Sequence, residues 1–451
     1  LAGALPKGQN NPQRCPYGLY AEQLSGTAFT APRDHNQRSW LYRTRPSVQH
    51  VPFEALEGTA GDNAALVSDF TVASKDAAVH PDQMRWLPCA IPGAGDRTDF
   101  VQGLRTVGGA GEPTLKSGLA IHMYTCNATM ADKAFVNSDG DFLIVPQQGA
   151  LRVTTEFGVL DVDPKEIVVV QRGIHFSVAV AGPSRGYVLE VYDRHFQLPD
   201  LGPIGANGLA NPRDFELPVA RYENREGVDF HVVYKFAGKL FEARQSFSPF
   251  NVVAYHGNYV PYKYDLRKFC CMNSVTFDHP DPSIYTVLTC QSNEPGVAVA
   301  DFVIFPPRWM AMEHSFRPPY YHRNCMSEFM GMVYGVYDAK TDVSAGDGAG
   351  AKPSGFFPGG ASLHSCMVPH GPDAGTFAKA TAANLKPHFF GGGLAFMFET
   401  SYILKLTRFA TEGDHVDRDY YKCWENLPNN FDPTNRGTSD ASNLAVWDLS
   451  W

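Results

Sequence analysis

The chain has 451 residues, of which 44% are hydrophobic and 19% are charged, and its formal net charge is −9. A chain of this length is too long for one ordinary core, and its composition is globular, so we expect two domains. The acidic balance argues against nucleic acid as a partner. The most apolar stretch, 296–305, is interrupted by Asp301 and ends at Pro306, well short of a membrane span.

Nine cysteines are scattered along the chain, an odd number without the spacing of a zinc site. Most of them are expected to be small buried side chains of a protein in a reducing compartment. Residues 1–7 lack the charged start and the long apolar core of a signal peptide. These features together predict a cytoplasmic protein.

Glycine and proline are frequent, with 41 and 33 copies, and few stretches show sustained helical periodicity. This combination favours many short strands, and hence an all-β sandwich or barrel. Residues 1 to about 50 have the character of an arm, in which arginines are mixed with aromatic residues. Such mixing is enriched at protein interfaces, but a loop packed on its own domain explains it equally well. The residues concerned are Arg33, Arg38, Trp40, Tyr42, Arg43 and Arg45.

The strand pattern is clearest between 118 and 180. Residues 141–149 and 151–158 predict a hairpin-like pair of strands around Gly149. The succession of strands and glycine turns resembles a cupin barrel. His122 and His175 lie in this region, but no carboxylate is placed between them to complete a metal site, so we expect both to be structural. This first barrel is therefore predicted to be a degenerate copy.

The following region, 219–267, contains a strand-like segment at 230–236 and a short helical candidate near 240–244. We place a domain boundary close to residue 267. The predicted division is an N-terminal degenerate cupin-like β domain with its arm, 1–267, and a C-terminal cupin-like domain that binds a metal, 268–451. The whole chain is thus expected to be all-β, with two cupin-like halves of jelly-roll or sandwich type.

The chemistry is predicted to lie in the second half, in the stretch 316–331. His322 and Glu328 are six residues apart, so on an unbroken strand both side chains point to the same face. A helix would place them on different faces, and Pro318-Pro319 argue against a helix here. A second unusual stretch, 359–373, holds two further histidines. Two histidines and one carboxylate, without a CxxC or HExxH motif, are the ingredients of the facial triad of non-haem Fe(II) oxygenases.

His322, Glu328 and His370 form the favoured set. A lone histidine is usually structural, but Glu328 lies in an apolar neighbourhood, where an unpaired carboxylate is costly and a metal would satisfy it. That neighbourhood consists of Cys325, Met326, Phe329 and Met330. His364 is the rival ligand, because it shares strand parity with His370. We interpret it as a residue that does not bind the metal itself but holds a metal ligand or the substrate in position.

Several long motifs resemble the homogentisate 1,2-dioxygenase family, and the resemblance covers nearly the whole chain. They are 17–33, 202–215, 256–259, 277–282 and 421–425, together with the two stretches described above. The resemblance implies cleavage of homogentisate by dioxygen to 4-maleylacetoacetate, in tyrosine and phenylalanine catabolism. It also implies a homohexamer built as a dimer of trimers.

The family's functional residues carry over to positions of this chain. The resemblance implies that His322, Glu328 and His370 bind one Fe(II), with His370 also next to the substrate. It implies that His279 is the acid/base, and that Tyr337 and Lys340 contact the substrate. From the residues alone, His279 is better interpreted as a turn histidine, and Lys340 equally well as a solvated lysine. The segment 341–353 is an insertion relative to the family pattern, expected to be exposed.

Two alternatives remain open at the level of the sequence. One is a related dioxygenase that acts on gentisate or another hydroquinone. The other is a non-catalytic protein with two cupin barrels, whose role is binding or storage.

Overall fold

The computed structural model describes residues 1–8, 12–59, 61–200, 210–271, 282–312, 318–337, 355–384 and 386–434. Strands dominate these ranges, and their two α-helices are short: α1 (Ala374–Ala382) and α2 (Arg408–Glu412). The prediction of an all-β fold is confirmed. His279, Lys340 and the segment 341–353 lie outside the described residues.

The first half of the chain forms an eight-stranded jelly roll. One sheet has the order β12-β9-β14-β7 and the facing sheet β11-β10-β13-β8, so consecutive strands alternate between sheets except at β10–β11. This alternation defines a jelly roll, the architecture of cupins. The strands are β7 (Ser117–Cys126), β8 (Lys133–Asn137), β9 (Asp141–Gln148), β10 (Leu151–Thr155), β11 (Gly158–Val162), β12 (Glu166–Val170), β13 (His175–Val180) and β14 (Ser184–Val191).

Two local predictions in this half are wrong. β9 and β10 belong to different sheets, so they form no hairpin around Gly149; β10 pairs instead with β11. Gly149 turns the chain from one sheet to the other with a φ of 76°, a value that favours glycine. The helical candidate near 240–244 lies within β17 (Lys239–Phe247), which pairs with β16 (Glu226–Phe236).

The second half repeats the strand order of the first. The run β20-β21-β26-β23-β24 corresponds to β6-β7-β14-β9-β12, with every neighbouring pair antiparallel. The pair β22–β25 takes the place of β8–β13. The strands are β6 (Leu104–Glu112), β20 (Thr286–Gln291), β21 (Ala298–Phe305), β22 (Arg308–Ala311), β23 (Ser327–Gly335), β24 (Ala361–His364), β25 (His388–Phe390) and β26 (Gly393–Thr400).

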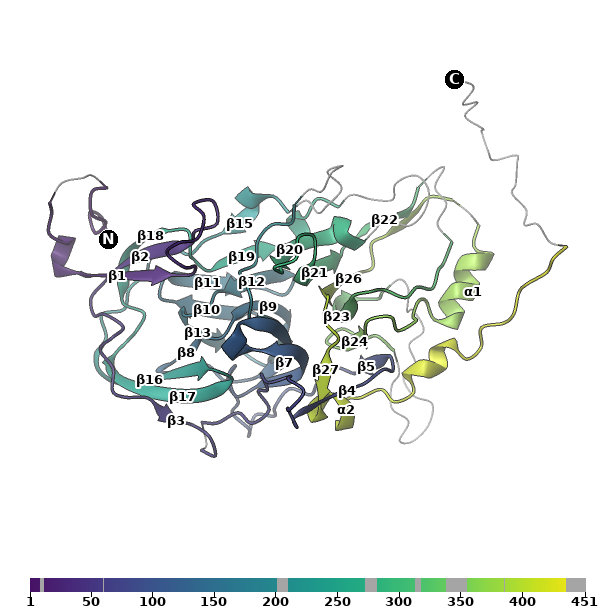
Figure 1. Cartoon of the computed structure of the whole chain (residues 1–451), viewed down its shortest axis with the longest axis horizontal. Helices are drawn as coiled ribbons and strands as arrows, with labels where there is room; N and C mark the ends of the chain where they lie inside the picture. The colour runs from purple at the N-terminus through teal and green to yellow at the C-terminus, as the bar shows by residue number, and fades with distance from the viewer. Residues whose placement is uncertain are drawn as a thin grey trace, which may run out of the picture.

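The two halves pack against each other and exchange strands (Figure 1). β5 (Met84–Trp86) joins the second half by pairing with β24, while β27 (Lys405–Thr407) returns to the first half beside β6 and β4 (Ala77–Val79). The largest of the apolar clusters draws residues from both halves. Within it, the hydroxyl of Tyr187 donates to the carbonyl of Gly360 at 2.7 Å. The division into domains at residue 267 stays a prediction, because the chain crosses between the barrels more than once.

The interior of the first barrel has its own packed core, which includes Phe142, Ile144, Val168 and Val188. Side chains therefore fill the space where a ligand of a functional cupin barrel would lie. The remaining strands are β1 (Tyr20–Ser25), β2 (Arg38–Arg43), β3 (Glu54–Ala55), β15 (Phe215–Glu216), β18 (Val252–Gly257) and β19 (Tyr262–Asp265).

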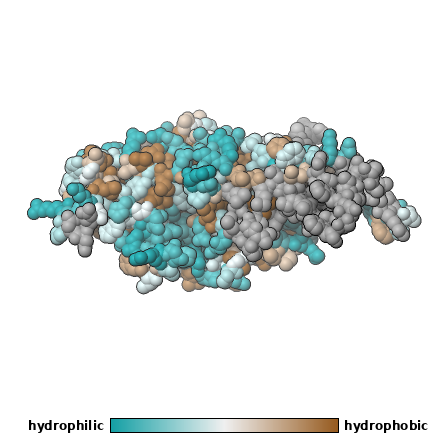
Figure 2. Space-filling model, turned by 90° about the horizontal axis from the view of Figure 1, so that it is seen from above, coloured by the Kyte–Doolittle hydropathy of each residue, from teal (hydrophilic) through white to brown (hydrophobic). Residues whose placement is uncertain are grey.

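The N-terminal arm includes β1 and β2, which form a sheet with β18. Arg43 at the end of β2 is fully buried, and it bonds to Glu22 at 2.9 Å and to Glu156 at 3.0 Å. For this arginine the structure favours packing within the chain over a subunit contact. The face of the molecule in Figure 2 mixes hydrophilic and hydrophobic residues.

All nine cysteines are free, but only Cys126 and Cys290 are buried. The expectation that most of them are buried is therefore wrong, because two are exposed and five are half-buried, and sequence alone does not reveal exposure. Among the described residues, no helix has the length and apolar character needed to cross a membrane.

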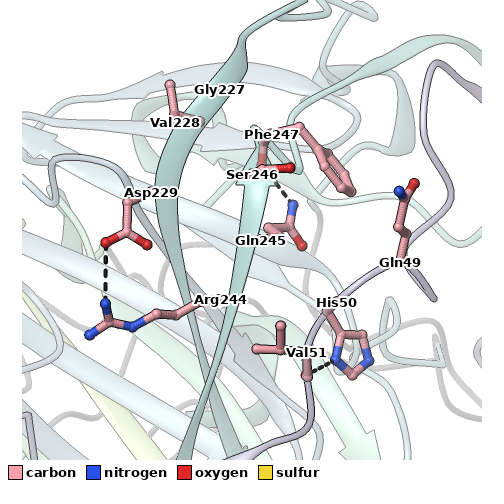
Figure 3. A pocket seen from close by; sticks show the side chains of 10 residues that line it. All are labelled: Gln49, His50, Val51, Gly227, Val228, Asp229, Arg244, Gln245, Ser246 and Phe247. Carbon is pink, nitrogen blue, oxygen red and sulfur yellow. Dashed lines mark hydrogen bonds and ion pairs between the residues drawn. The ribbon is translucent and has the colours of Figure 1, made fainter.

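A surface cavity of about 610 Å³ lies in the first half, beside β16 and β17 (Figure 3). Three of its polar side chains are bonded to neighbours: Arg244 pairs with Asp229 at 3.2 Å, and Gln245 donates to the carbonyl of Phe247 at 2.8 Å. It contains none of the residues that the sequence singled out. The cavity therefore gives no reason to place the chemistry here.

Candidate metal centre

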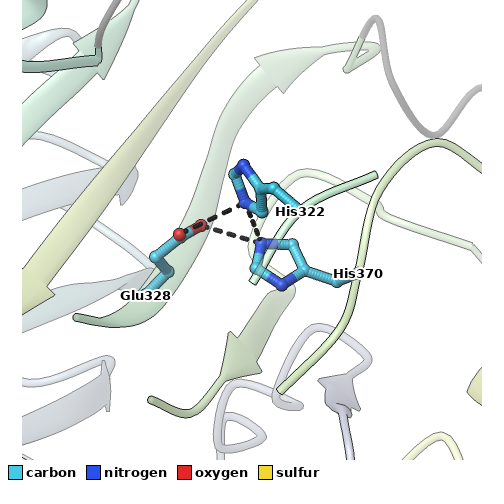
Figure 4. A group of neighbouring side chains, drawn as sticks. All are labelled: His322, Glu328 and His370. Atoms are coloured by element: carbon cyan, nitrogen blue, oxygen red, sulfur yellow. Dashed lines mark hydrogen bonds and ion pairs between the residues drawn. The ribbon is translucent and has the colours of Figure 1, made fainter. Parts of the chain in front are cut away.

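His322, Glu328 and His370 point their polar atoms at one another (Figure 4). The two Nε2 atoms are 2.6 Å apart, Nε2 of His370 is 3.1 Å from Oε2 of Glu328, and Nε2 of His322 is 3.4 Å from Oε1. Among the described residues, this is the one group of three or more metal-ligating side chains whose ligand atoms lie within 4.8 Å of one another. Donors that converge in this way share a centre where a cation would fit.

The backbone explains how His322 and His370 meet, although they are far apart in the sequence. Their main chains form an isolated bridge with reciprocal hydrogen bonds of 2.9 and 3.0 Å. Glu328 is the second residue of β23, which begins only at Ser327. The parity argument is therefore wrong for His322, because no unbroken strand joins it to Glu328. The convergence instead comes from the bridge.

The ring of His370 is oriented as a ligand would be. Its Nδ1 lies 2.9 Å from the carbonyl of Val368, a position in which Nδ1 carries the proton and donates it. In the tautomer that a bound metal requires, the lone pair lies on Nε2, which faces Glu328 and His322; without a metal, a proton on Nε2 can instead be donated to Glu328. A second hydrogen bond of this kind, through the other ring nitrogen, is the usual support of a metal-binding histidine.

Glu328 is buried and yet ionised. Burial raises the pKa of its carboxyl, but hydrogen bonds with His322 and His370, together with the amide of Asn324, outweigh burial and hold the pKa well below its ordinary range. The donor set is two imidazole nitrogens and one carboxylate oxygen, without a thiolate. This set fits a divalent first-row metal better than a structural zinc site.

His364 lies directly behind His370. The two rings stack in parallel with centroids 4.0 Å apart, and His364 Nε2 is 2.8 Å from the hydroxyl of Tyr420. Tyr420 in turn lies under the guanidinium of Arg85, at 4.3 Å, and Arg85 pairs with Asp417 at 2.6 Å. His364 is thus next to a triad residue and outside the three-residue group.

Sequence reasoning missed Tyr420, Arg85 and Asn324. Tyr420 and Arg85 reach the site from distant segments, and nothing in their local sequence indicates it. Asn324 did carry a signal, since it lies inside the motif between His322 and Glu328. Its Nδ2 donates to Oε1 of Glu328 and to Oε1 of Glu399, both at 2.8 Å.

Tyr337 follows β23 and is half-buried, with its ring 5.9 Å from that of Phe305 and 5.8 Å from that of Phe356. Burial chiefly raises the pKa of Tyr420.

The two histidines of the first barrel are bonded within its core. His122 contacts Glu190 at 3.1 Å and Thr106 at 2.9 Å, and His175 contacts Glu156 at 3.0 Å. Each imidazole has its own carboxylate, and the two are not brought together.

A pair of jelly rolls, of which the second holds two histidines and one carboxylate around a common centre, defines a cupin-type protein with a candidate metal site. The model of the family "Homogentisate 1,2-dioxygenase N-terminal" matches residues 1–266, and the model "Homogentisate 1,2-dioxygenase C-terminal" matches residues 267–431. The chain belongs to the homogentisate 1,2-dioxygenase family.

Curated relatives named homogentisate 1,2-dioxygenase match over nearly their whole length. The protein of Dictyostelium discoideum is 58% identical over 432 residues, which are 95% of this chain and 94% of the relative. The human protein is 54% identical over 442 residues, 97% of this chain and 95% of the relative. Among solved structures, a mutant oxalate decarboxylase of Bacillus subtilis covers 74% of this chain and 82% of its own at 12% identity, with a TM-score of 0.30.

Proposed function

We propose that this protein is a homogentisate 1,2-dioxygenase, which cleaves the ring of homogentisate with dioxygen to give 4-maleylacetoacetate. Membership of the family and relatives of that name along nearly the whole chain support the substrate. The observation that carries the reaction class is the convergence of His322, Glu328 and His370. Neither the gentisate-type alternative nor the storage protein gains support from the fold, the site or the relatives.

The proposed metal is Fe(II), held by His322, Glu328 and His370. Three protein ligands on one side of a metal leave positions open for substrate and dioxygen, the arrangement typical of non-haem Fe(II) oxygenases. When bound, iron would supply the redox chemistry with dioxygen, while the protein supplies orientation and proton handling. His364 would keep the ring of His370 in place by stacking.

The remaining roles rest on the resemblance of the sequence. His279 is proposed as the acid/base that takes the proton from the substrate hydroxyl, since the ordinary pKa of imidazole, ~6.5, permits transfer in both directions near neutral pH. Tyr337 and Lys340 are proposed to contact the substrate, along with His370. A cytoplasmic homohexamer made of two trimers, and the two-domain division at residue 267, are proposals of the same kind.

The test is oxygen consumption by the purified chain loaded with Fe(II), with homogentisate and gentisate supplied in parallel. We expect turnover of homogentisate that depends on added Fe(II), and little turnover of gentisate. Faster turnover of gentisate would assign the protein to the alternative dioxygenase. Full iron loading without turnover of either substrate would favour the storage protein.

A further inference from the structure

Both barrels contain the same pair of side chains. One is an asparagine a few residues ahead of a strand, β9 in the first barrel and β23 in the second, and the other is a glutamate on the last strand of the jelly roll. In the first barrel, Nδ2 of Asn137 donates to Oε1 of Glu190 on β14 at 2.7 Å. In the second, Nδ2 of Asn324 donates to Oε1 of Glu399 on β26 at 2.8 Å. In both cases the asparagine Oδ1 accepts, at 3.0 Å, the backbone N–H of the residue two positions later. The pair is a shared structural element of the two halves.

The barrels differ in the residue that stands beside this glutamate in the sheet. Glu190 is in register with Phe142 on β9, whereas Glu399 is in register with Glu328 on β23. Phe142 fills the core of the first barrel, and Glu328 belongs to the candidate metal centre. The amide of Asn324 therefore contacts a second carboxylate, which Asn137 does not have.

We propose that Asn324 is a positioning residue for the metal ligand Glu328. Its two N–H groups are divided between Glu328 and Glu399, so that a donor keeps the two neighbouring carboxylates apart and fixes the Oε1 side of Glu328. Oε2 is thereby directed to Nε2 of His370, at 3.1 Å. This inference rests on the metal site of the proposed function, and it does not depend on which hydroquinone is cleaved.

The asparagine is itself held in place, as a positioning residue must be. Its Oδ1 is bound by the N–H of Met326, and the adjoining Ser327 is tied at both sides: its hydroxyl donates to the carbonyl of Tyr402 at 2.7 Å and accepts the N–H of Cys366 at 3.0 Å. The short segment between His322 and β23 is thus fixed without being a strand. Partners that orient a metal-binding carboxylate typically contribute about 10–100-fold to metal affinity.

The experiment compares Asn324→Leu with Asn137→Leu, because each removes the same amide contact from one barrel. Leucine has a similar size and no donor. The metal-free proteins are titrated anaerobically with Fe(II) alone against a competing chelator, and their melting temperatures are recorded. We expect Asn324→Leu to weaken Fe(II) binding by about 10–100-fold. Asn137→Leu should lower the melting temperature and leave Fe(II) affinity at the parent value.

The outcomes distinguish a failure of the positioning role of Asn324 from a failure of the proposed metal site. If the parent binds Fe(II) and Asn324→Leu binds it equally well, the positioning role is wrong while the proposed function stands. If both variants lose affinity to the same extent, the loss reflects general stability and the role is again wrong. If the parent protein does not bind Fe(II), the proposed metal site itself fails. Should Asn324→Leu not fold, Asn324→Val, which is smaller and also has no donor, is expected to show the same loss of affinity.

Discussion

Glu328 is the only carboxylate of the three-residue group, and it supplies the negative charge of the proposed centre. We predict that Glu328→Ala loses bound iron and all measurable turnover of homogentisate, because two neutral imidazoles alone hold Fe(II) poorly. Metal analysis and oxygen consumption on the same preparation measure both effects. Glu216→Ala, which changes an exposed carboxylate on β15, serves as the control. Full iron content with normal turnover in Glu328→Ala would show that the ligands are misassigned.

His279 is expected to affect the chemistry and not the metal. Removing a positioned acid/base typically lowers the rate by about 10²–10⁴-fold. His279→Gln should therefore keep its iron and its melting temperature, and lose turnover by that order in a single-turnover measurement. If His279 is only a turn histidine, the kinetics of the folded fraction stay unchanged. Loss of iron together with activity would instead make His279 a ligand.

The three-residue group could be predicted from residue types, since a glutamate in an apolar segment calls for compensation. The even spacing of His322 and Glu328 predicted that the two side chains lie together, but the reason was wrong, because no strand joins them. The hydrogen bond between His364 and Tyr420 joins residues 56 positions apart, so local sequence does not reveal it. Asn324 was within reach of prediction, but an asparagine in a loop usually bonds only to its own backbone.

At the scale of elements, strand content could be predicted and strand partners could not. β9 and β10 follow each other with a glycine between them, the pattern of a hairpin, yet the jelly roll sends them to opposite sheets. The candidate helix at 240–244 lies in a strand because pairing of β17 with β16 overrides local preference. The local sequences of β5 and β27 do not reveal that each strand pairs with the other half of the chain.

The exchanged strand β5 carries a testable ion pair. Arg85 and Asp417 are 4% and 6% exposed, so loss of either partner leaves a buried charge. We predict that Arg85→Met lowers the free energy of unfolding by about 3–5 kcal/mol, and that adding Asp417→Leu restores part of it. Denaturant unfolding measures both. The control is Arg152→Met, whose pairing with Asp161 is exposed and should contribute less than about 1 kcal/mol. Equal effects at the two sites would contradict the argument.

At the scale of the whole molecule, the two barrels satisfy their buried carboxylates differently. In the first barrel Glu190 contacts the ammonium of Lys235 at 2.7 Å, as well as His122 and Asn137. The positive charge that balances this carboxylate is therefore a side chain of the protein itself. In the second, two imidazoles converge on Glu328, and this is where we propose a bound metal cation. One fold thus serves as a sealed scaffold in the first half and as a candidate metal site in the second.

The sealed first barrel makes the protein sensitive to acid. Burial raises the pKa of Glu190 and of Glu156, but cationic and hydrogen-bonding neighbours, chiefly Lys235 and His122 for Glu190 and His175 and Arg43 for Glu156, lower both to about 2, from 4.5. Because the folded pKa lies below the ordinary value, each carboxylate stabilises the fold above pH 4.5, and this stability is lost as the pH falls towards 2. A difference of this size corresponds to about 3 kcal/mol per carboxylate.

We therefore expect the melting temperature of the metal-free protein to fall steeply between pH 4.5 and pH 3. Burial also lowers the pKa of His122 in the folded protein. Below pH 6.5 the unfolded chain therefore binds this proton more readily than the folded protein, which further reduces stability as the pH falls. Glu156→Gln should melt lower than the parent at pH 7 and depend less on acid, so that the two curves converge as the pH falls. Glu57→Gln, which changes an exposed side chain, should follow the parent throughout. Parallel curves for Glu156→Gln and the parent would show that Glu156 adds nothing to acid sensitivity.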